Sequence, residues 1–266
     1  MRRLILLLAT IGATVLLASG VAYALDVRCD AASDPDTAPG QCLGTPDDDE
    51  IFGTARPDVI RALNGFDDVF ARAGGDEIYG GNLADYLEGG IGWDTYFGGK
   101  GADYLTELDS FDSGRDVMNG GPNNDVLEGG GGGDILRGQA GDESDTGDPT
   151  DSAMFGDPGN DELYGGTGDD AMEGEEGTDE HYGGPDDDFI DAANNETYAT
   201  DAPDLVDCGD GFDTALVLPN DIVDENCEDV LEVFPGEGPV VVAASGGADD
   251  ADQRRLEERF LKVRGG

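Results

Sequence analysis

Aspartate recurs at a fixed interval through most of this chain, with glycine before it and a large apolar residue after it. Between residues 44 and 216 the sequence divides into units of nine, with glycine at position one, aspartate at position six and an apolar residue at position eight. Three successive copies begin at Gly80, Gly89 and Gly98 without slippage. Carboxylates beside glycines offer charged oxygens together with unobstructed backbone carbonyls, the ligands that calcium prefers. The spacing therefore predicts a series of calcium sites.

The period persists through almost the whole region. Units begin at 44, 53, 62, 71, 80, 89, 98, 111, 120, 129, 138, 147, 156, 165, 174, 183, 199 and 208. The extra residues 107–110 and 192–198 are predicted to be loops that leave the repeat. Position six departs from aspartate at Glu143 and Ser152, and position eight is polar at Asp145 and His181. We expect a bulge, or a break into two stacks, near residues 143–152.

The candidate metal ligands are aspartates at position six and glycines at position four. The aspartates are Asp67, Asp76, Asp85, Asp94, Asp103, Asp134, Asp161, Asp170, Asp179 and Asp188. The glycines are Gly65, Gly74, Gly92, Gly101, Gly132, Gly159, Gly168 and Gly177. Glycines at positions one, two and four are expected to adopt positive φ, so that their carbonyls turn towards an ion. Magnesium is less suitable, because it requires strict octahedral geometry and retains its waters.

Some turns depart from this pattern and are interpreted as structural turns without an ion. They have other residues at position four: Asp47, Arg56, Asn123, Asp186 and Ala202.

Each unit predicts a turn followed by a very short strand, since a glycine- and aspartate-rich stretch precedes one apolar residue between two others. Such strands are unstable alone, but parallel stacking lets each bond to its neighbours and buries the position-eight side chains in one stripe. The fold class is therefore all-β.

These features resemble the repeats-in-toxin (RTX), or hemolysin-type calcium-binding, nonapeptide family, over most of residues 44–191. The resemblance implies a right-handed parallel β-roll, a β-solenoid in which two nonapeptides form one turn and several calcium ions lie between stacked turns. Asp85 would then lie over Asp67 on one side, and Asp94 over Asp76 on the other.

The charge of the chain limits its partners. It contains 61 acidic and 14 basic residues, for a formal net charge of -47. Nucleic acids and anionic membranes would repel such a chain. Strong self-repulsion and few large apolar residues favour disorder until cations neutralise the carboxylates. We therefore expect folding to depend on calcium.

Residues 1–24 are typical of a secretory signal peptide. Two arginines precede an apolar run at residues 4–18, and Ala22–Ala24 fits a cleavage site. The run is short for a membrane span and no second one follows, so we expect a secreted, extracellular protein without a membrane span after cleavage.

Export favours disulfide bonds, and the four cysteines flank the repeats in two pairs. Three pairings are open; joining Cys29 to Cys42 and Cys208 to Cys227 closes the shortest loops. A zinc site is the weaker alternative, since Cys-x-x-Cys does not occur and the single histidine is remote in sequence.

The predicted organisation has five parts. They are a signal peptide at 1–24, an N-terminal flank or cap at 25–43, the calcium-binding β-roll at 44–191, degenerate repeats and a C-terminal cap at 192–232, and a linker with a helical tail at 233–266. The linker includes the apolar run Val240–Ala244. The tail has apolar residues at helical spacing, Leu256, Phe260 and Val263.

The sequence contains neither His-Glu-x-x-His nor Gly-x-Ser-x-Gly, and its only histidine, His181, occupies an apolar repeat position. Adjacent carboxylates are too common in this chain to indicate a glycosidase. The prediction is a non-enzymatic calcium-binding protein with a structural, adhesive or cell-surface role. The alternative is a polysaccharide-binding or polysaccharide-active β-solenoid.

Overall fold

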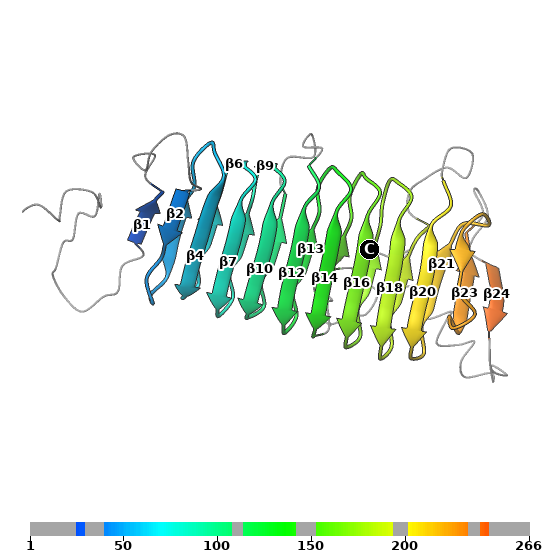
Figure 1. Cartoon of the computed structure of the whole chain (residues 1–266). Coiled ribbons are helices and arrows are strands. Elements are labelled where there is room, and N and C mark those ends of the chain that lie inside the picture. The colour runs from blue at the N-terminus through cyan, green and yellow to red at the C-terminus, as the bar shows by residue number, and fades with distance from the viewer. Residues whose placement is uncertain are drawn as a thin grey trace, which may run out of the picture.

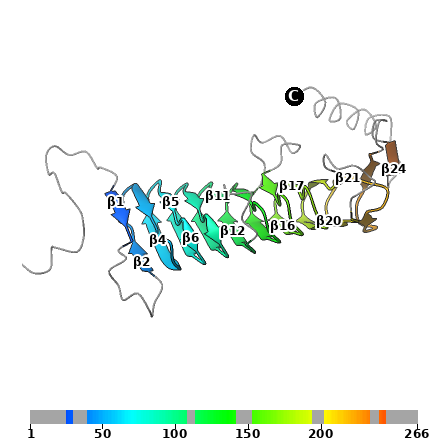
Figure 2. The ribbon, with the colours of Figure 1, turned by 90° about the horizontal axis from the view of Figure 1, so that it is seen from above.

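The computed structural model describes residues 25–29, 40–107, 114–141, 153–193, 202–233 and 240–244. All regular secondary structure in these ranges is β-strand. The strands form two long sheets that face each other along a rod, with the N-terminal strands at one end and the C-terminal strands at the other (Figures 1 and 2). The chain is a parallel β-solenoid, which confirms the predicted fold class.

Sheet A contains twelve strands. In spatial order they are β1 (Leu25–Arg28), β3 (Asp49–Phe52), β5 (Asp68–Phe70), β8 (Tyr86–Glu88), β11 (Tyr104–Thr106), β13 (Val126–Glu128), β15 (Met154–Phe155), β17 (Ala171–Glu173), β19 (Phe189–Asp191), β21 (Thr214–Val217), β23 (Asp229–Glu232) and β24 (Val240–Ala244). All pairs except β23 with β24 are parallel.

Sheet B contains ten strands, and most run on into the following turn. In spatial order they are β2 (Gly40–Leu43), β4 (Asp58–Asn64), β7 (Glu77–Asn82), β10 (Thr95–Lys100), β12 (Val117–Pro122), β14 (Ile135–Ala140), β16 (Glu162–Thr167), β18 (Glu180–Pro185), β20 (Leu205–Asp210) and β22 (Ile222–Val223). A two-stranded sheet pairs β6 (Ala73–Gly74) with β9 (Ile91–Gly92) in turns that lead from sheet A to sheet B.

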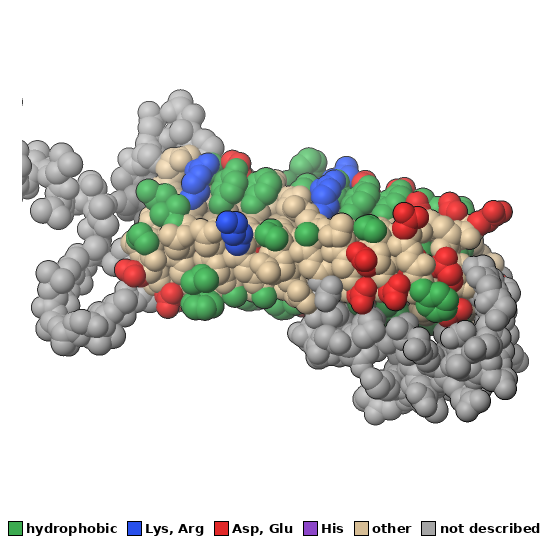
Figure 3. All heavy atoms as spheres, turned by 90° about the horizontal axis from the view of Figure 1, so that it is seen from below, with side chains coloured by type: hydrophobic (Ala, Val, Ile, Leu, Met, Phe, Trp, Pro, Cys, Tyr) green, Lys and Arg blue, Asp and Glu red, His purple; other side chains and the backbone are tan. Residues whose placement is uncertain are grey.

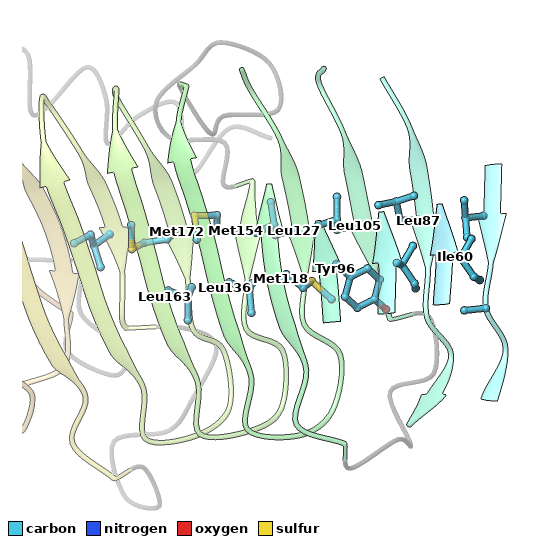
Figure 4. Close-up of a cluster of buried hydrophobic side chains, with 14 of the residues drawn as sticks. Ile60, Leu87, Tyr96, Leu105, Met118, Leu127, Leu136, Met154, Leu163 and Met172 are labelled. Carbon is cyan, nitrogen blue, oxygen red and sulfur yellow. The ribbon is translucent and has the colours of Figure 1, made fainter. Parts of the chain in front are cut away.

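The register confirms two nonapeptides per turn. Leu87 pairs with Val69 in sheet A, and Ile78 pairs with Ile60 in sheet B, so equivalent residues of adjacent turns are eighteen apart. Position-eight side chains point between the sheets and form a continuous column (Figure 4). Its aliphatic members are fully buried, and each such burial contributes about 1.5–3 kcal/mol.

Residues 143–152 do not break the coil into two stacks; the register across them contains extra residues, as the alternative expectation of a bulge requires. In sheet A, Leu127 pairs with Met154, and in sheet B, Leu136 pairs with Leu163. The residues of each pair are 27 positions apart instead of eighteen. This turn therefore contains nine extra residues, and the coil continues on both sides of them. The reason is that Met154 restores the apolar position after the polar Asp145, which lies outside the described residues together with Ser152.

Both cysteine-bearing flanks extend the coil. β1 and β2 pair with β3 and β4 and add one strand to each sheet, and Cys29 is bonded to Cys42. At the other end Cys208 is bonded to Cys227. The two local disulfides are thus confirmed, and the cysteines are not available as zinc ligands.

One segment of the predicted linker is structured. Val240–Ala244 forms β24 and pairs antiparallel with β23. The interpretation as a linker was wrong for these five residues, because a β-branched run can pair with the edge that β23 leaves open. The signal peptide and the helical tail lie outside the described residues. None of the described residues belongs to a helix that is long and apolar enough to cross a membrane.

Candidate functional site

The position-six aspartates form two ladders along the rod. The first ladder contains Asp49, Asp67, Asp85, Asp103, Asp125, Asp170, Asp188 and Asp213, and the second contains Asp58, Asp76, Asp94, Asp116, Asp134, Asp161, Asp179 and Asp204. All are at most 4% exposed. Each ladder lies where a turn enters its strand, so the repeat brings the candidate aspartates together in two lines.

One carboxylate oxygen of each rung supports the backbone. The N–H of Asp67 donates to Oδ1 of Asp85 at 3.0 Å, and the N–H of Asp85 donates to Oδ1 of Asp103 at 2.9 Å. The second ladder repeats this bond from Asp134 to Asp161 at 2.6 Å. A hydrogen-bond acceptor is therefore required at position six for the coil itself, before any ion is considered.

The other oxygen, Oδ2, is buried without a hydrogen bond at several rungs: Asp67, Asp76, Asp85, Asp103, Asp161 and Asp188. Leaving a buried charged oxygen unsatisfied costs several kcal/mol, roughly the loss of its hydration. A regular series of such atoms indicates a missing electrostatic partner.

The position-one glycine shows where that partner fits. A Cβ placed on Gly80 would lie 2.6 Å from Oδ2 of Asp85 and 2.6 Å from the carbonyl oxygen of Gly98 in the next turn. At Gly156 the equivalent distances are 2.8 Å to Asp161 and 2.7 Å to the Gly174 carbonyl. We call this space, bounded by a position-one residue, its own position-six Oδ2 and the carbonyl of the next turn, a slot.

The predicted role of glycine needs correction. Position two has positive φ on both sides of the coil, even in Leu63 and Arg72. Among the candidate glycines only Gly65, Gly101 and Gly168 have positive φ. The remainder, Gly74, Gly92, Gly132, Gly159 and Gly177, lie in the opposite line of turns, where a Cβ would collide with the backbone of the preceding turn or with the aspartate two residues on. Position-one glycines likewise provide space and do not have positive φ.

Burial shifts the ladder carboxyl groups strongly. It raises the pKa of Asp67 and Asp103 to about 6, that of Asp76 to about 7, that of Asp85 to about 8 and that of Asp161 to about 9. The backbone N–H bond opposes the shift in each case, and repulsion from stacked aspartates increases it for Asp76, Asp85 and Asp161. At neutral pH the folded ladder therefore favours either protons or a cation.

The donor set of a slot fits calcium. Both the identified donors, a carboxylate Oδ2 and a backbone carbonyl, are hard oxygens, and calcium accepts six to eight such ligands in flexible geometry. The position-six aspartates and the position-one carbonyls of the next turn would hold the ion. Its charge would offset the burial cost of the carboxylates and link successive turns.

The ladders also contain aspartates that were not among the predicted metal ligands. The same offset would have identified Asp49, Asp58, Asp116, Asp125, Asp204 and Asp213. Beyond the last repeat, Oδ1 of Asp221 accepts from Asp204 and Oε2 of Glu228 accepts from Asp213. These two acids do not occupy position six of a nine-residue unit, so the repeat does not predict them.

The slot of Gly89 is filled by side chains of this chain. The Tyr96 hydroxyl and the Glu107 carboxylate both reach it beside Asp94, and Tyr96 donates to Oε1 of Glu107. The carboxylates of Asp94, Glu107 and Asp116 lie within 4.8 Å of one another. Burial raises the pKa of Glu107 to about 10.

The slot of Gly174 is a second exception, because the ring of His181 reaches it. This ring is fully buried in the position-eight column, and Nε2 lies 2.8 Å from the place of a Cβ on Gly174. Burial lowers its pKa to about 4, against a smaller opposing effect of the Leu205 backbone. Neither ring nitrogen has a hydrogen bond that meets ordinary geometric limits.

Outside the ladders, acidic side chains also cover the surface. On the face seen in Figure 3 they gather towards the C-terminal end of the rod, while the few basic side chains lie nearer the middle and the N-terminal end. Within the described residues, the Arg115 guanidinium contacts Glu162 at 3.0 Å. Such an excess of exposed carboxylates also raises the local concentration of cations.

A stacked coil with two lines of oxygen-lined slots defines a class of repeat protein built to hold divalent cations between its turns. The chain matches the RTX calcium-binding nonapeptide repeat (4 copies) at residues 43–78, 70–105, 112–142, 147–180 and 155–190, more than half of its length. The protein belongs to this RTX calcium-binding repeat family, which implies that it binds calcium. No curated protein matches the chain.

Proposed function

We propose that this protein is an exported calcium-binding rod that folds when calcium enters the two lines of slots, and that it has a structural or adhesive role without catalysis. The main support for calcium binding is the series of buried Oδ2 atoms that face the carbonyl of the next turn. Because the ion binds the ordered turns, its binding free energy contributes to folding.

Two features support export. The first 24 residues have the pattern of a cleaved signal peptide, and both flanks carry disulfides, which persist in oxidising compartments. At the affinity of extracellular calcium modules, roughly 0.1–1 mM, the chain would remain unfolded in a calcium-poor cytoplasm and fold after release.

Stacked aromatic residues on the coil support the structural role. Tyr86 and Tyr104 stack with centroids 5.6 Å apart, and Tyr79 stacks on Phe97 at 4.8 Å. These rings stabilise adjacent strands. Trp93, Phe66 and Phe212 are exposed elsewhere on the coil, and polysaccharide binding through such rings is the alternative function.

Far-UV circular dichroism during a calcium titration tests the folding proposal. Purified protein, beginning at residue 25, should change from a disordered spectrum in chelator to a β-rich spectrum in millimolar calcium. Magnesium at the same concentration is the control and should produce much less change, because it resists the flexible oxygen coordination of the slots. Identical spectra in chelator and in calcium would refute the proposal.

Export is tested separately by producing the full chain and a variant that lacks residues 1–24 in a bacterial host. Mass spectrometry should find the full-length product outside the cytoplasm with Leu25 as its first residue, and the truncated variant inside. Retention of the full chain with its leader intact would contradict export.

A further inference from the structure

We propose that the slot of Gly174 is a mixed nitrogen and oxygen site that takes a first-row transition-metal ion in place of calcium. The proposal goes beyond the calcium function and rests on it only in requiring a folded coil. It concerns a single slot, set apart by the histidine at position eight of its unit.

The geometry of this slot differs from that of its neighbours in one donor. A Cβ on Gly174 would lie 2.5 Å from Oδ2 of Asp179 and 2.8 Å from Nε2 of His181. One turn earlier, at Gly156, the equivalent atoms are Oδ2 of Asp161 and the carbonyl oxygen of Gly174. At Gly174 an imidazole nitrogen therefore lies beside the aspartate, whereas at Gly156 the atom beside the aspartate is an oxygen.

The imidazole is available for a ligand. His181 is fully buried, and neither of its ring nitrogens has a hydrogen bond within ordinary geometric limits, although buried imidazoles normally have one. The residues that pair with His181 in the adjacent turns are Leu163 and Val206, so the position itself is suited to an apolar side chain. A metal bound to Nε2 would satisfy a polar atom that the apolar column leaves without a partner.

The ligand types determine the class of ion. Calcium binds oxygen and has little preference for imidazole, whereas zinc, cobalt, nickel and copper bind imidazole well and also accept carboxylate. The pair of His181 and Asp179 thus favours a borderline divalent ion. Only the unit at 174 adds a histidine to its ladder aspartate, and this histidine is the only one in the chain.

Cobalt(II) is a suitable probe because its visible absorption reports nitrogen and oxygen ligands. The full mature chain is first saturated with calcium and then titrated with cobalt(II). Absorption and elemental analysis after gel filtration should both indicate about one tightly held cobalt ion per chain. Circular dichroism recorded in the same samples reports whether the coil is folded.

Three variants locate the ion. His181→Leu gives this position the same side chain as Leu163, its partner one turn away. The variant should no longer bind cobalt but should still fold with calcium. Asp179→Asn should weaken cobalt binding at least tenfold. Its matched control, Asp161→Asn in the adjacent slot, should leave cobalt binding unchanged.

The outcomes separate this proposal from the calcium function. Calcium-dependent folding without cobalt binding would overturn the transition-metal site and leave the calcium function intact. Equal cobalt binding by His181→Leu would also overturn it, because the ion would then occupy oxygen sites. Cobalt bound through His181 in a coil that does not respond to calcium would support this site and contradict the calcium function.

Discussion

At the scale of single residues, a position-six aspartate such as Asp85 performs two separable tasks. Its Oδ1 accepts the backbone N–H of the preceding turn, whereas its Oδ2 faces the slot. The first task requires only a hydrogen-bond acceptor, and the second requires negative charge. Asparagine can perform the first task but not the second, which makes the two experimentally distinguishable.

Replacing Asp85 by asparagine should retain the bond from the Asp67 N–H but weaken calcium binding in that slot. We expect at least about a tenfold loss of affinity there, and a higher calcium concentration at the folding midpoint. Asp68→Asn removes the same charge from an exposed neighbouring position and is the matched control. Equal midpoints for the two variants, measured by circular dichroism, would exclude Asp85 as a ligand.

Without calcium, the coil should become more stable as the pH falls. Burial raises the pKa values of Asp76, Asp85 and Asp161 to between about 7 and 9, above the value near 4 of an unfolded chain. The folded state therefore binds more protons, and its stability is fully present below about pH 4 and is lost as pH rises through 6 to 9. In chelator, β-structure measured at pH 5 should exceed that at pH 8.5. Greater order at pH 8.5 would show that the ladder carboxyl groups are not buried as described.

At the scale of the turn, close approach of backbones limits the choice of residue. β6 pairs with β9, and the bridges Gly114 with Gly132 and Gly159 with Gly177 continue the same line of position-four residues. A side chain at this position would penetrate the backbone of the preceding turn. The glycine requirement is thus steric, and it holds whether or not an ion is bound.

Gly92→Ala should destabilise the calcium-loaded coil by about 1–3 kcal/mol, because its Cβ would overlap the carbonyl of Gly74. Gly75→Ala is the matched control, since its Cβ would lie 3.2 Å from the nearest backbone oxygen, that of Trp93. Chemical denaturation at saturating calcium measures the difference. Equal midpoints for both variants would contradict the close stacking of the turns.

The repeat was sufficient to predict the turns, because register and residue type recur together and each unit contacts only its neighbours. It therefore indicated the short strands and the apolar column, whereas the eighteen-residue stacking and the two aspartate ladders were implied by the family resemblance. It could not indicate that Glu107 reaches the Gly89 slot, since Glu107 begins an inserted stretch. Nor could it indicate Asp221 and Glu228, which complete the ladders from irregular segments. Those residues are positioned by the folded coil and not by the period.

At the scale of the whole molecule, the rod has ends that need protection. The described flanks carry the coil beyond the repeats at both ends, and each contains a disulfide. β24 then pairs antiparallel on β23, which interrupts the parallel edge. Reversing the strand direction and closing the flank covalently both limit edge-to-edge association of rods.

Replacing Cys208 and Cys227 together by alanine should destabilise the C-terminal end by about 2–4 kcal/mol, because the bond closes a loop across nineteen residues. Stability in a solenoid is largely local, so the loss should not spread evenly. Hydrogen exchange should increase in β20 to β23 and remain unchanged in β7 and β10. Uniform loss of protection along the rod would show that the coil unfolds as one unit.

Anomalous diffraction from crystals grown in calcium would show whether the buried slots hold the ion. We expect anomalous peaks beside Oδ2 of Asp85, Asp103 and Asp161, each shared with the carbonyl of the next turn. Peaks confined to exposed carboxylates, with these Oδ2 atoms still lacking a partner, would contradict calcium binding in the slots.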